Sequence, residues 1–209
     1  MIRTMATLLR RQGYAATGWR QVVGESGAPW GSQAHHFPGG KQQLAAEAVA
    51  SAGSAYQRML RAALESSHPA DAVLAWADLA ASQLEASGWV DGCPVATVAL
   101  EQAASSDTLA AACAIALTGW RDTLTEAIAA HGAATPEAAS LATLILAGIE
   151  GALLLSRATR DPGPLRTVGS ELATALRARL QPASVSSCDT GGATASAAPD
   201  TPTRDQTGI

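Results

Sequence analysis

Apolar residues recur every three or four positions along most of the first 180 residues, a spacing that predicts amphipathic helices. No stretch shows the alternation of β-branched and polar residues that predicts a strand. Glycine and proline interrupt the pattern and set the expected ends of the helices. The pattern therefore predicts an all-α fold with helices over residues 2–12, 17–24, 30–37, 41–66, 69–87, 95–105, 107–131, 136–159 and 165–180.

The second and third of these helices are short and are separated by a turn. Thr17 stands at the start of the first, where its hydroxyl can cap the orphan N–H groups. Gly27 suits the turn because a residue without Cβ takes positive φ easily, and Pro29 suits the first turn of the next helix. Pro38, Gly39 and Gly40 then end that helix. Two short helices joined by a glycine-containing turn predict a helix-turn-helix.

Composition and charge change this picture in two ways. Hydrophobic residues make up 47% of the 209 residues, and the dominance of alanine favours packed helices. The formal net charge is -4 overall. Residues 1–66 hold seven Lys and Arg against three Glu, which gives +4 and leaves -8 for the remainder. A basic head on an acidic body is typical of a nucleic-acid contact at one end, although chance clustering of surface arginines explains the same count.

These observations divide the chain into three parts. Residues 1–42 are expected to form a helix-turn-helix DNA-binding domain of three helices, and residues 43–181 a larger helical body. Residues 182–209 contain mostly Ser, Thr, Ala, Gly, Pro and Asp, so they are expected to be a disordered tail.

Several classes of protein are not expected. Cys93, Cys113 and Cys188 share no metal-ligand spacing, and the chain shows no secretory signal, so a cytoplasmic protein with reduced thiols is predicted. The apolar run over residues 141–155 is interrupted by Glu150 and is shorter than a membrane span. The sequence shows no nucleophile–base pair and no metal-binding motif, so an enzyme is not expected. No cofactor, metal or membrane partner is expected either.

Four segments carry a resemblance to a known family. The first two are GYxxT at residues 13–17 and the stretch over residues 27–41, which includes GAP, GS and HHFPGGK. The other two are DGCPVATVALE at residues 91–101 and EGALLLSR at residues 150–157. Together they resemble the TetR family of transcriptional regulators. The FPGGK form and the last two segments are similar to its LmrA/YxaF-like subgroup.

The resemblance implies an all-helical homodimer that binds a palindromic double-stranded DNA operator through its two heads. A small hydrophobic or aromatic inducer would enter the body and release the DNA, which makes a ligand-responsive repressor the expected function. The sequence departs from relatives at Trp30, Gln33 and Ala34, where Ala34 replaces a tyrosine that touches a phosphate. The alternative is a helical small-molecule sensor or carrier whose DNA-binding head is weakened.

Three sets of candidate site residues follow. Hydroxyls, imidazoles, cations and residues early in the second helix of the motif contact phosphates and base edges in such heads. The DNA-binding candidates are Thr17, Arg20, Pro29, Trp30, Gly31, Ser32, Gln33, His35, His36 and Lys41. Large rings and their neighbours border cavities in an alanine-rich bundle. The ligand-binding candidates are Trp76, Trp89, Cys93, Val95, Leu100 and Trp120, although each Trp also suits ordinary core packing.

Small residues and a leucine stripe in the last two helices predict the dimer interface. The candidates are Gly148, Gly151, Ala152, Leu155, Leu172 and Leu176, and packing within one chain explains the same pattern. Glu150 is the unusual residue here, because a buried carboxylate needs a partner, for which Arg157 or Arg121 is the candidate.

Overall fold

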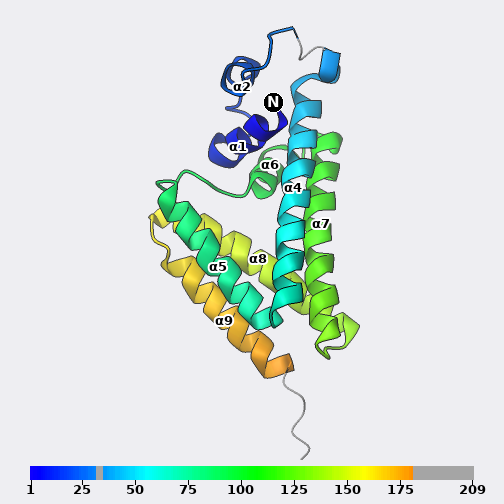
Figure 1. The fold of residues 1–209 in the computed structure, drawn as a ribbon, viewed down its shortest axis with the longest axis vertical. Helices are drawn as coiled ribbons and strands as arrows, with labels where there is room; N and C mark the ends of the chain where they lie inside the picture. The colour runs from blue at the N-terminus through cyan, green and yellow to red at the C-terminus, as the bar shows by residue number, and fades with distance from the viewer. Residues whose placement is uncertain (32–34, 181–209) are drawn as a thin grey trace, which may run out of the picture.

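The computed structural model describes residues 1–31 and 35–180. Within them the chain is helical and has no strand, which confirms the all-α class (Figure 1). The helices are α1 (Ile2–Gln12), α2 (Trp19–Ser26), α4 (Gly40–Ser66), α5 (Pro69–Ala86), α6 (Pro94–Gln102), α7 (Asp107–Ala130), α8 (Thr135–Thr159) and α9 (Gly163–Leu180). The predicted bounds of most of these helices differ from the observed ones by one to three residues.

The helices form a small head and a larger body. Helices α1 and α2 lie at one end of the long helix α4, which runs beside α7 through the body (Figure 1). Helices α5, α8 and α9 pack together on the other side, and α6 lies between α1 and α7. The short α6 is therefore in contact with both the head and the body.

Small residues allow the close approach of the body helices. A Cβ on Gly53 in α4 would lie 2.7 Å from the Cβ of Ala116 in α7, so these two helices meet almost backbone to backbone. The Trp120 indole N–H also donates to the Gly53 carbonyl at 2.8 Å. The abundance of alanine thus serves close helix packing, as van der Waals contact between backbones requires small side chains.

Two features at the helix ends differ in detail from expectation. Helix α2 begins at Trp19 with Gly18 before it, so the predicted cap by Thr17 is wrong. The Thr17 side chain is fully buried, and its hydroxyl donates to the Gly13 carbonyl at 2.6 Å instead. By contrast, a side chain does cap α7, where the Ser106 hydroxyl accepts from the Leu109 N–H at 3.2 Å.

The structure describes the second helix of the motif only in part and does not describe the tail. Trp30 lies in a turn, and His35 and His36 are helical. Residues 32–34 and the predicted tail lie outside the described residues, as does Cys188.

Candidate functional site

The exposed surface of the head holds most of the candidate DNA contacts. Trp30 is 56% exposed, an unusual state for the largest side chain. The side chain of Lys41 is half-buried, with its amine 4.1 Å from the centre of the Tyr14 ring. The Thr17 hydroxyl is buried and bonded to the Gly13 carbonyl, so this residue holds the turn between α1 and α2 and is not part of the exposed surface. The other exposed candidates are Arg20, Pro29, Gly31, His35 and His36, and Ser32 and Gln33 lie outside the described residues.

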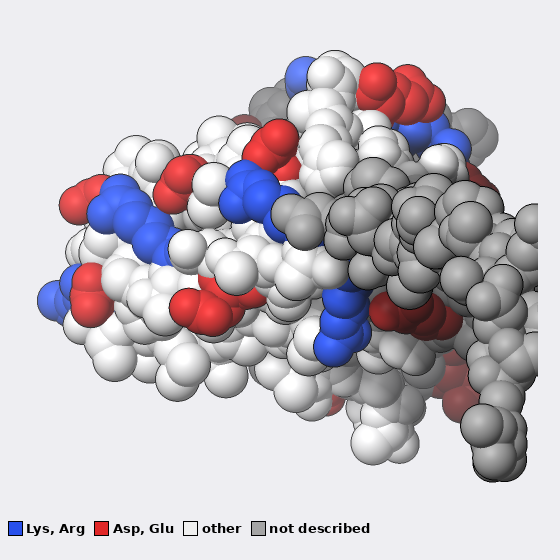
Figure 2. Space-filling model, turned by 90° about the horizontal axis from the view of Figure 1, so that it is seen from below, with Lys and Arg blue, Asp and Glu red and all other residues white. Residues whose placement is uncertain are grey.

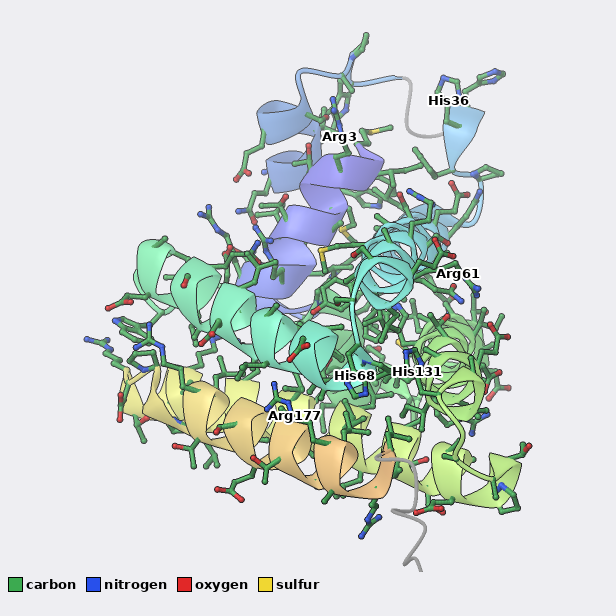
Figure 3. All side chains as sticks on the ribbon, turned by 60° about the horizontal axis from the view of Figure 1, so that its bottom comes forward. Arg3, His36, Arg61, His68, His131 and Arg177 are labelled. Carbon is green, nitrogen blue, oxygen red and sulfur yellow. The ribbon has the colours of Figure 1, made fainter. Side chains whose placement is uncertain are left out.

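The two histidines at the end of the motif lie close to each other. The rings of His35 and His36 are 5.1 Å apart and meet edge to face. Beside them Phe37 is buried and packs against Trp19 at a ring distance of 6.5 Å. Figure 3 labels His36 and Arg3 at the outer end of the head, far from α9. This end of the molecule therefore offers imidazoles and a cation to a polyanion.

The opposite end of the molecule has a different charge pattern. Figure 2 shows that face with acidic and basic side chains interspersed and separated by broad uncharged areas. Asp71 and Arg177 form one such pair between α5 and α9. Charges of both signs side by side cancel at a distance, so the described residues on this face offer no extended field to DNA.

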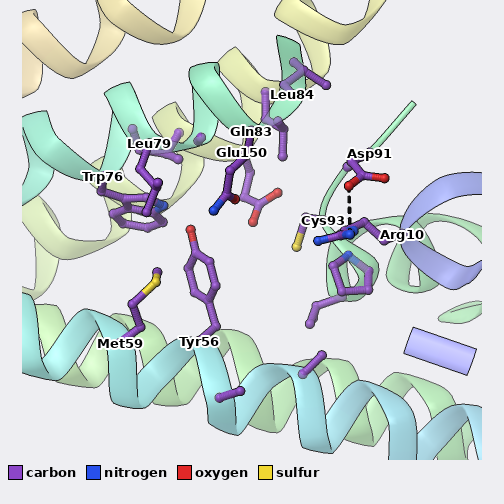
Figure 4. Close-up of a pocket in the computed structure, with 18 of the residues that line it drawn as sticks. Arg10, Tyr56, Met59, Trp76, Leu79, Gln83, Leu84, Asp91, Cys93 and Glu150 are labelled. Atoms are coloured by element: carbon purple, nitrogen blue, oxygen red, sulfur yellow. Dashed lines mark ion pairs between the residues drawn. The ribbon is translucent and has the colours of Figure 1, made fainter. Parts of the chain in front are cut away.

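A cavity of about 380 Å³ lies in the body between α1, α4, α5, α7 and α8. Ligand pockets in proteins begin at about this size. Tyr56, Trp76 and Trp120 form an aromatic wall, in which the Tyr56 ring lies 5.7 Å from Trp76 and 4.9 Å from Trp120. Arg10, Gln83, Asp91, Cys93 and Glu150 supply polar groups around the same space (Figure 4).

The structure brings together four of the six predicted ligand-binding residues. Trp76, Cys93, Val95 and Trp120 line the cavity. Leu100 does not, because α6 turns Val95 and Val98 inward and leaves Leu100 83% exposed on the outer side. Trp89 does not line it either: this residue lies in the loop after α5, at a positive φ of 68°.

Six polar or aromatic residues of the cavity were not among the predicted ligand contacts: Thr7, Arg10, Tyr56, Gln83, Asp91 and Glu150. They come from α1, α4, α5, the 91–93 loop and α8, which are far apart in the sequence. Only Glu150 stands out in the sequence, as a carboxylate inside an apolar helix. The other five have ordinary helix or loop patterns that do not show which face points to the cavity.

Glu150 has neither of its predicted ion-pair partners. Arg157 donates to the carbonyl of Arg11 at 2.8 Å, and Arg121 pairs with Asp122 at 2.7 Å, so both predicted pairs are wrong. Burial raises the pKa of the Glu150 carboxyl, and a hydrogen bond with the Cys93 thiol opposes that effect. Burial and the nearby Glu150 raise the pKa of Cys93, so its thiol keeps the proton that it donates.

A clamp joins α1 to the loop at the mouth of the cavity. Asp91 binds Arg10 at 2.8 Å and Arg11 at 3.1 Å through its two carboxylate oxygens. The Gly92 N–H donates to the Arg10 carbonyl at 3.1 Å. The guanidinium of Arg157, on α8, donates to the Arg11 carbonyl. The last turn of α1 is therefore held by the same loop that borders the cavity.

A second clamp joins the head to the far end of α6. The Glu101 carboxylate accepts from the N–H groups of Tyr14 at 2.8 Å and Ala15 at 2.9 Å. Gly13 has a φ of 80°, and a Cβ there would overlap the Glu101 side chain. Burial lowers the pKa of Lys41, and the Glu101 charge opposes that effect. Helix α6 thus starts in the cavity, where Cys93 caps it, and ends on the head.

The predicted dimer residues fall on two sides of the last helices. Ala152, Leu172 and Leu176 are buried within one chain, and a Cβ on Gly148 would lie 3.3 Å from Leu172. These four pack inside the chain, where α8 lies against α7 and α9, and α9 lies against α5 and α8. Gly151 and Leu155 lie on the outer side of α8, with Leu155 55% exposed.

Helix α8 is longer than the expected apolar run. Its 25 residues and a mean hydropathy of 1.9 over the most apolar window make it the one described helix long and apolar enough to cross a membrane. Packing against α7 and α9 accounts for the same composition, since one side of the helix is buried there.

Comparison with known proteins assigns the chain to a family. Residues 69–171 match the C-terminal domain of LmrA/YxaF-like transcriptional regulators. The chain is 35% identical to the uncharacterized HTH-type transcriptional regulator YxaF of Bacillus subtilis over 85% of this chain and 93% of that protein. It is 34% identical to the HTH-type transcriptional regulator LmrA of the same species over 78% of this chain and 87% of that protein.

Solved structures agree with this assignment. A TetR transcriptional regulator from Chloroflexus aurantiacus superposes with a TM-score of 0.69 at 30% identity, covering 83% of this chain and 90% of that chain. The regulatory protein TetR from Rhodobacter sphaeroides shares the fold, with a TM-score of 0.74 at 23% identity over 83% of this chain and 95% of that chain. The relatives are regulators and not enzymes. The chain belongs to the TetR family of transcriptional regulators, in its LmrA/YxaF-like subgroup.

Proposed function

We propose that this regulator is a ligand-responsive cytoplasmic repressor that binds a palindromic operator as a homodimer. A small hydrophobic or aromatic inducer enters the cavity and releases the DNA. The observation that carries the proposal is α6, a nine-residue helix whose first turn borders the cavity and whose last turn holds the head through Glu101.

Binding to DNA rests on the exposed end of the head. Arg20, His35 and His36 present cationic or hydrogen-bonding groups there, and phosphate contacts position a head on the duplex. Trp30 in the same head has over half of its surface exposed, and contact with a sugar or base edge would cover it. Ser32 and Gln33 are kept as base-reading candidates on the basis of sequence, since a Gln can form paired hydrogen bonds with adenine.

Dimer formation rests on the outer side of α8. Leu144, Leu154 and Leu155 are 52%, 62% and 55% exposed. The small residues Ala147, Gly151 and Ala158 of the same helix are exposed as well. The positions 144, 147, 151, 154 and 158 follow a seven-residue repeat, the spacing by which two helices pack along a seam. A second copy of the chain covers this side, and two symmetric heads then read an inverted repeat.

Release follows from the two clamps on α1. A ligand that fills the cavity pushes on the 91–93 loop and on the start of α6, which hold α1 through Asp91 and Glu101. The spacing of the two heads then favours the state that does not fit DNA. A shift of the population from 1:99 to 99:1 requires ~5.5 kcal/mol of differential ligand binding between the two states.

Selection of DNA from a random-sequence pool by the purified protein tests the proposal. The expected result is enrichment of an inverted repeat whose half-sites are centred about one helical turn apart, or a multiple of it. Failure to enrich any sequence at low salt contradicts it and favours the ligand sensor or carrier with a weakened head. The sequence feature that favours this alternative is Ala34, which stands where relatives have a tyrosine that touches a phosphate.

A further inference from the structure

The charges around the cavity do not cancel. Three of its lining residues are formally charged: Arg10, Asp91 and Glu150. Arg10 forms an ion pair with Asp91 at 2.8 Å, so its positive charge already has a counter-charge. Among the described residues no Lys or Arg forms an ion pair with Glu150, whose hydrogen-bond partner is the neutral Cys93 thiol. One carboxylate is therefore left without a counter-charge.

The surroundings of Glu150 favour a cation of a particular kind. Figure 4 shows its carboxylate turned into the open space, beside the Gln83 side chain and on the side that faces Cys93. The rings of Tyr56, Trp76 and Trp120 form the adjacent wall. The faces of aromatic side chains attract cations, and they also stack on flat apolar rings. A nearby positive charge stabilises the ionised form of a carboxylate in a partly desolvated site.

Ligands of other charge fit this space less well. An anion would meet Glu150, while Arg10 is already bound to Asp91. A neutral aromatic molecule would desolvate Glu150 further without supplying a counter-charge, so the carboxyl would have to take up a proton, which costs free energy near neutral pH. A protonated nitrogen on an aromatic molecule satisfies both the carboxylate and the rings.

We propose that the effector of this cavity is an aromatic organic cation, whose protonated nitrogen pairs with Glu150 while its ring lies among Tyr56, Trp76 and Trp120. This rests on the ligand-responsive function proposed above. Pairing also draws the carboxylate away from the thiol of Cys93, the residue whose sulfur accepts from the Ala96 N–H at 3.4 Å at the start of α6. The charge of the ligand would thereby affect the start of α6, the helix whose other end holds the head.

Calorimetric titration near neutral pH with three matched probes tests the proposal. The probes are naphthylmethylamine, naphthalenemethanol and naphthoate, which share one ring system and differ in charge. The ammonium is expected to bind the dimer at least about tenfold more tightly than the alcohol, and the carboxylate more weakly than both. In Glu150→Gln the preference for the ammonium over the alcohol falls to within about twofold.

Glu137→Gln is the matched control, because Glu137 is exposed on the same helix α8. It is expected to keep the wild-type preference. Equal binding of ammonium and alcohol, no binding of the ammonium, or a preference that persists in a folded Glu150→Gln variant overturns the proposal.

Release of a fluorescent operator, measured by anisotropy, separates this proposal from the proposed function. Selective binding of the ammonium without operator release leaves the ligand class standing and counts against the repressor function. Equal release by ammonium and alcohol, with equal affinities, leaves the repressor function standing and overturns the ligand class.

Discussion

The carboxylate of Glu101 accepts a hydrogen bond from the backbone N–H of Tyr14 at 2.8 Å, so the last turn of α6 holds the turn that follows α1 through the main chain. A bond to backbone fixes the position of the segment without depending on which side chain the head carries. The contact is exposed, and its loss therefore costs little stability, because water can satisfy the freed groups.

Glu101→Gln is expected to weaken communication between ligand and operator. An uncharged amide accepts these hydrogen bonds less strongly, since bonds to an ionised acceptor are roughly twice as strong. The ratio of operator Kd with and without bound ligand should fall by several-fold, while the free energy of unfolding changes by ~1 kcal/mol or less. Glu85→Gln, an exposed change on α5, should leave the ratio as in wild type, and an unchanged ratio in Glu101→Gln would contradict the clamp.

Gly13→Ala is expected to destabilise the junction of head and body. The residue has a φ of 80°, and the new Cβ would overlap the Glu101 carboxylate. The free energy of unfolding in urea should fall by about 1 to 3 kcal/mol. Gly18→Ala offers a comparison, because no atom lies within 4 Å of its Cβ position and its φ is -100°. Similar stability losses for both variants would show that crowding at Glu101 is not the cause.

Arg20→Ala is expected to lower the salt dependence of operator binding. Each lost phosphate contact reduces the slope of log K against log salt by about one. Arg179→Ala removes an exposed arginine from the end of α9 and should leave the slope unchanged. Fluorescence anisotropy titrations over a range of salt give both slopes, and equal slopes for wild type and Arg20→Ala would remove Arg20 from the interface.

Leu155→Glu is expected to separate the dimer. The side chain is 55% exposed in one chain, and a charge placed at a seam with its symmetric copy is both desolvated and repelled. Sedimentation velocity should show a monomer at micromolar concentration. Ile115→Glu changes a residue on α7 that is 75% exposed and should remain dimeric. A dimeric Leu155→Glu protein would place the interface elsewhere.

The sequence predicted the helices well and the cavity only in part. Proline and glycine stop signals set the ends of α5 and α8 to within a few residues, because these signals act locally. Trp76 and Trp120 were found since large rings in an alanine-rich bundle border irregular space. Leu100 was misplaced, because the inward side of a nine-residue helix depends on what it packs against.

Contacts with the backbone were the part that sequence reasoning could not reach. Glu101 was recognised only as part of a motif, since its partners are two N–H groups at the end of α1 and any residue type there supplies them. Asp91 likewise appeared only as the first residue of the DGCPVATVALE segment, and its pairing with Arg10 and Arg11 spans about eighty positions. Periodicity carries no information about such distant pairs.

The bond from the Trp120 indole to the Gly53 carbonyl joins α7 to α4 beside the cavity. Helices α4 and α7 meet there with almost no side chain between them. In the release mechanism proposed above, a ligand is therefore expected to displace the opposite wall, formed by the 91–93 loop and α1, rather than to separate these two helices. The close contact of α4 with α7 would thus set the direction in which the head moves.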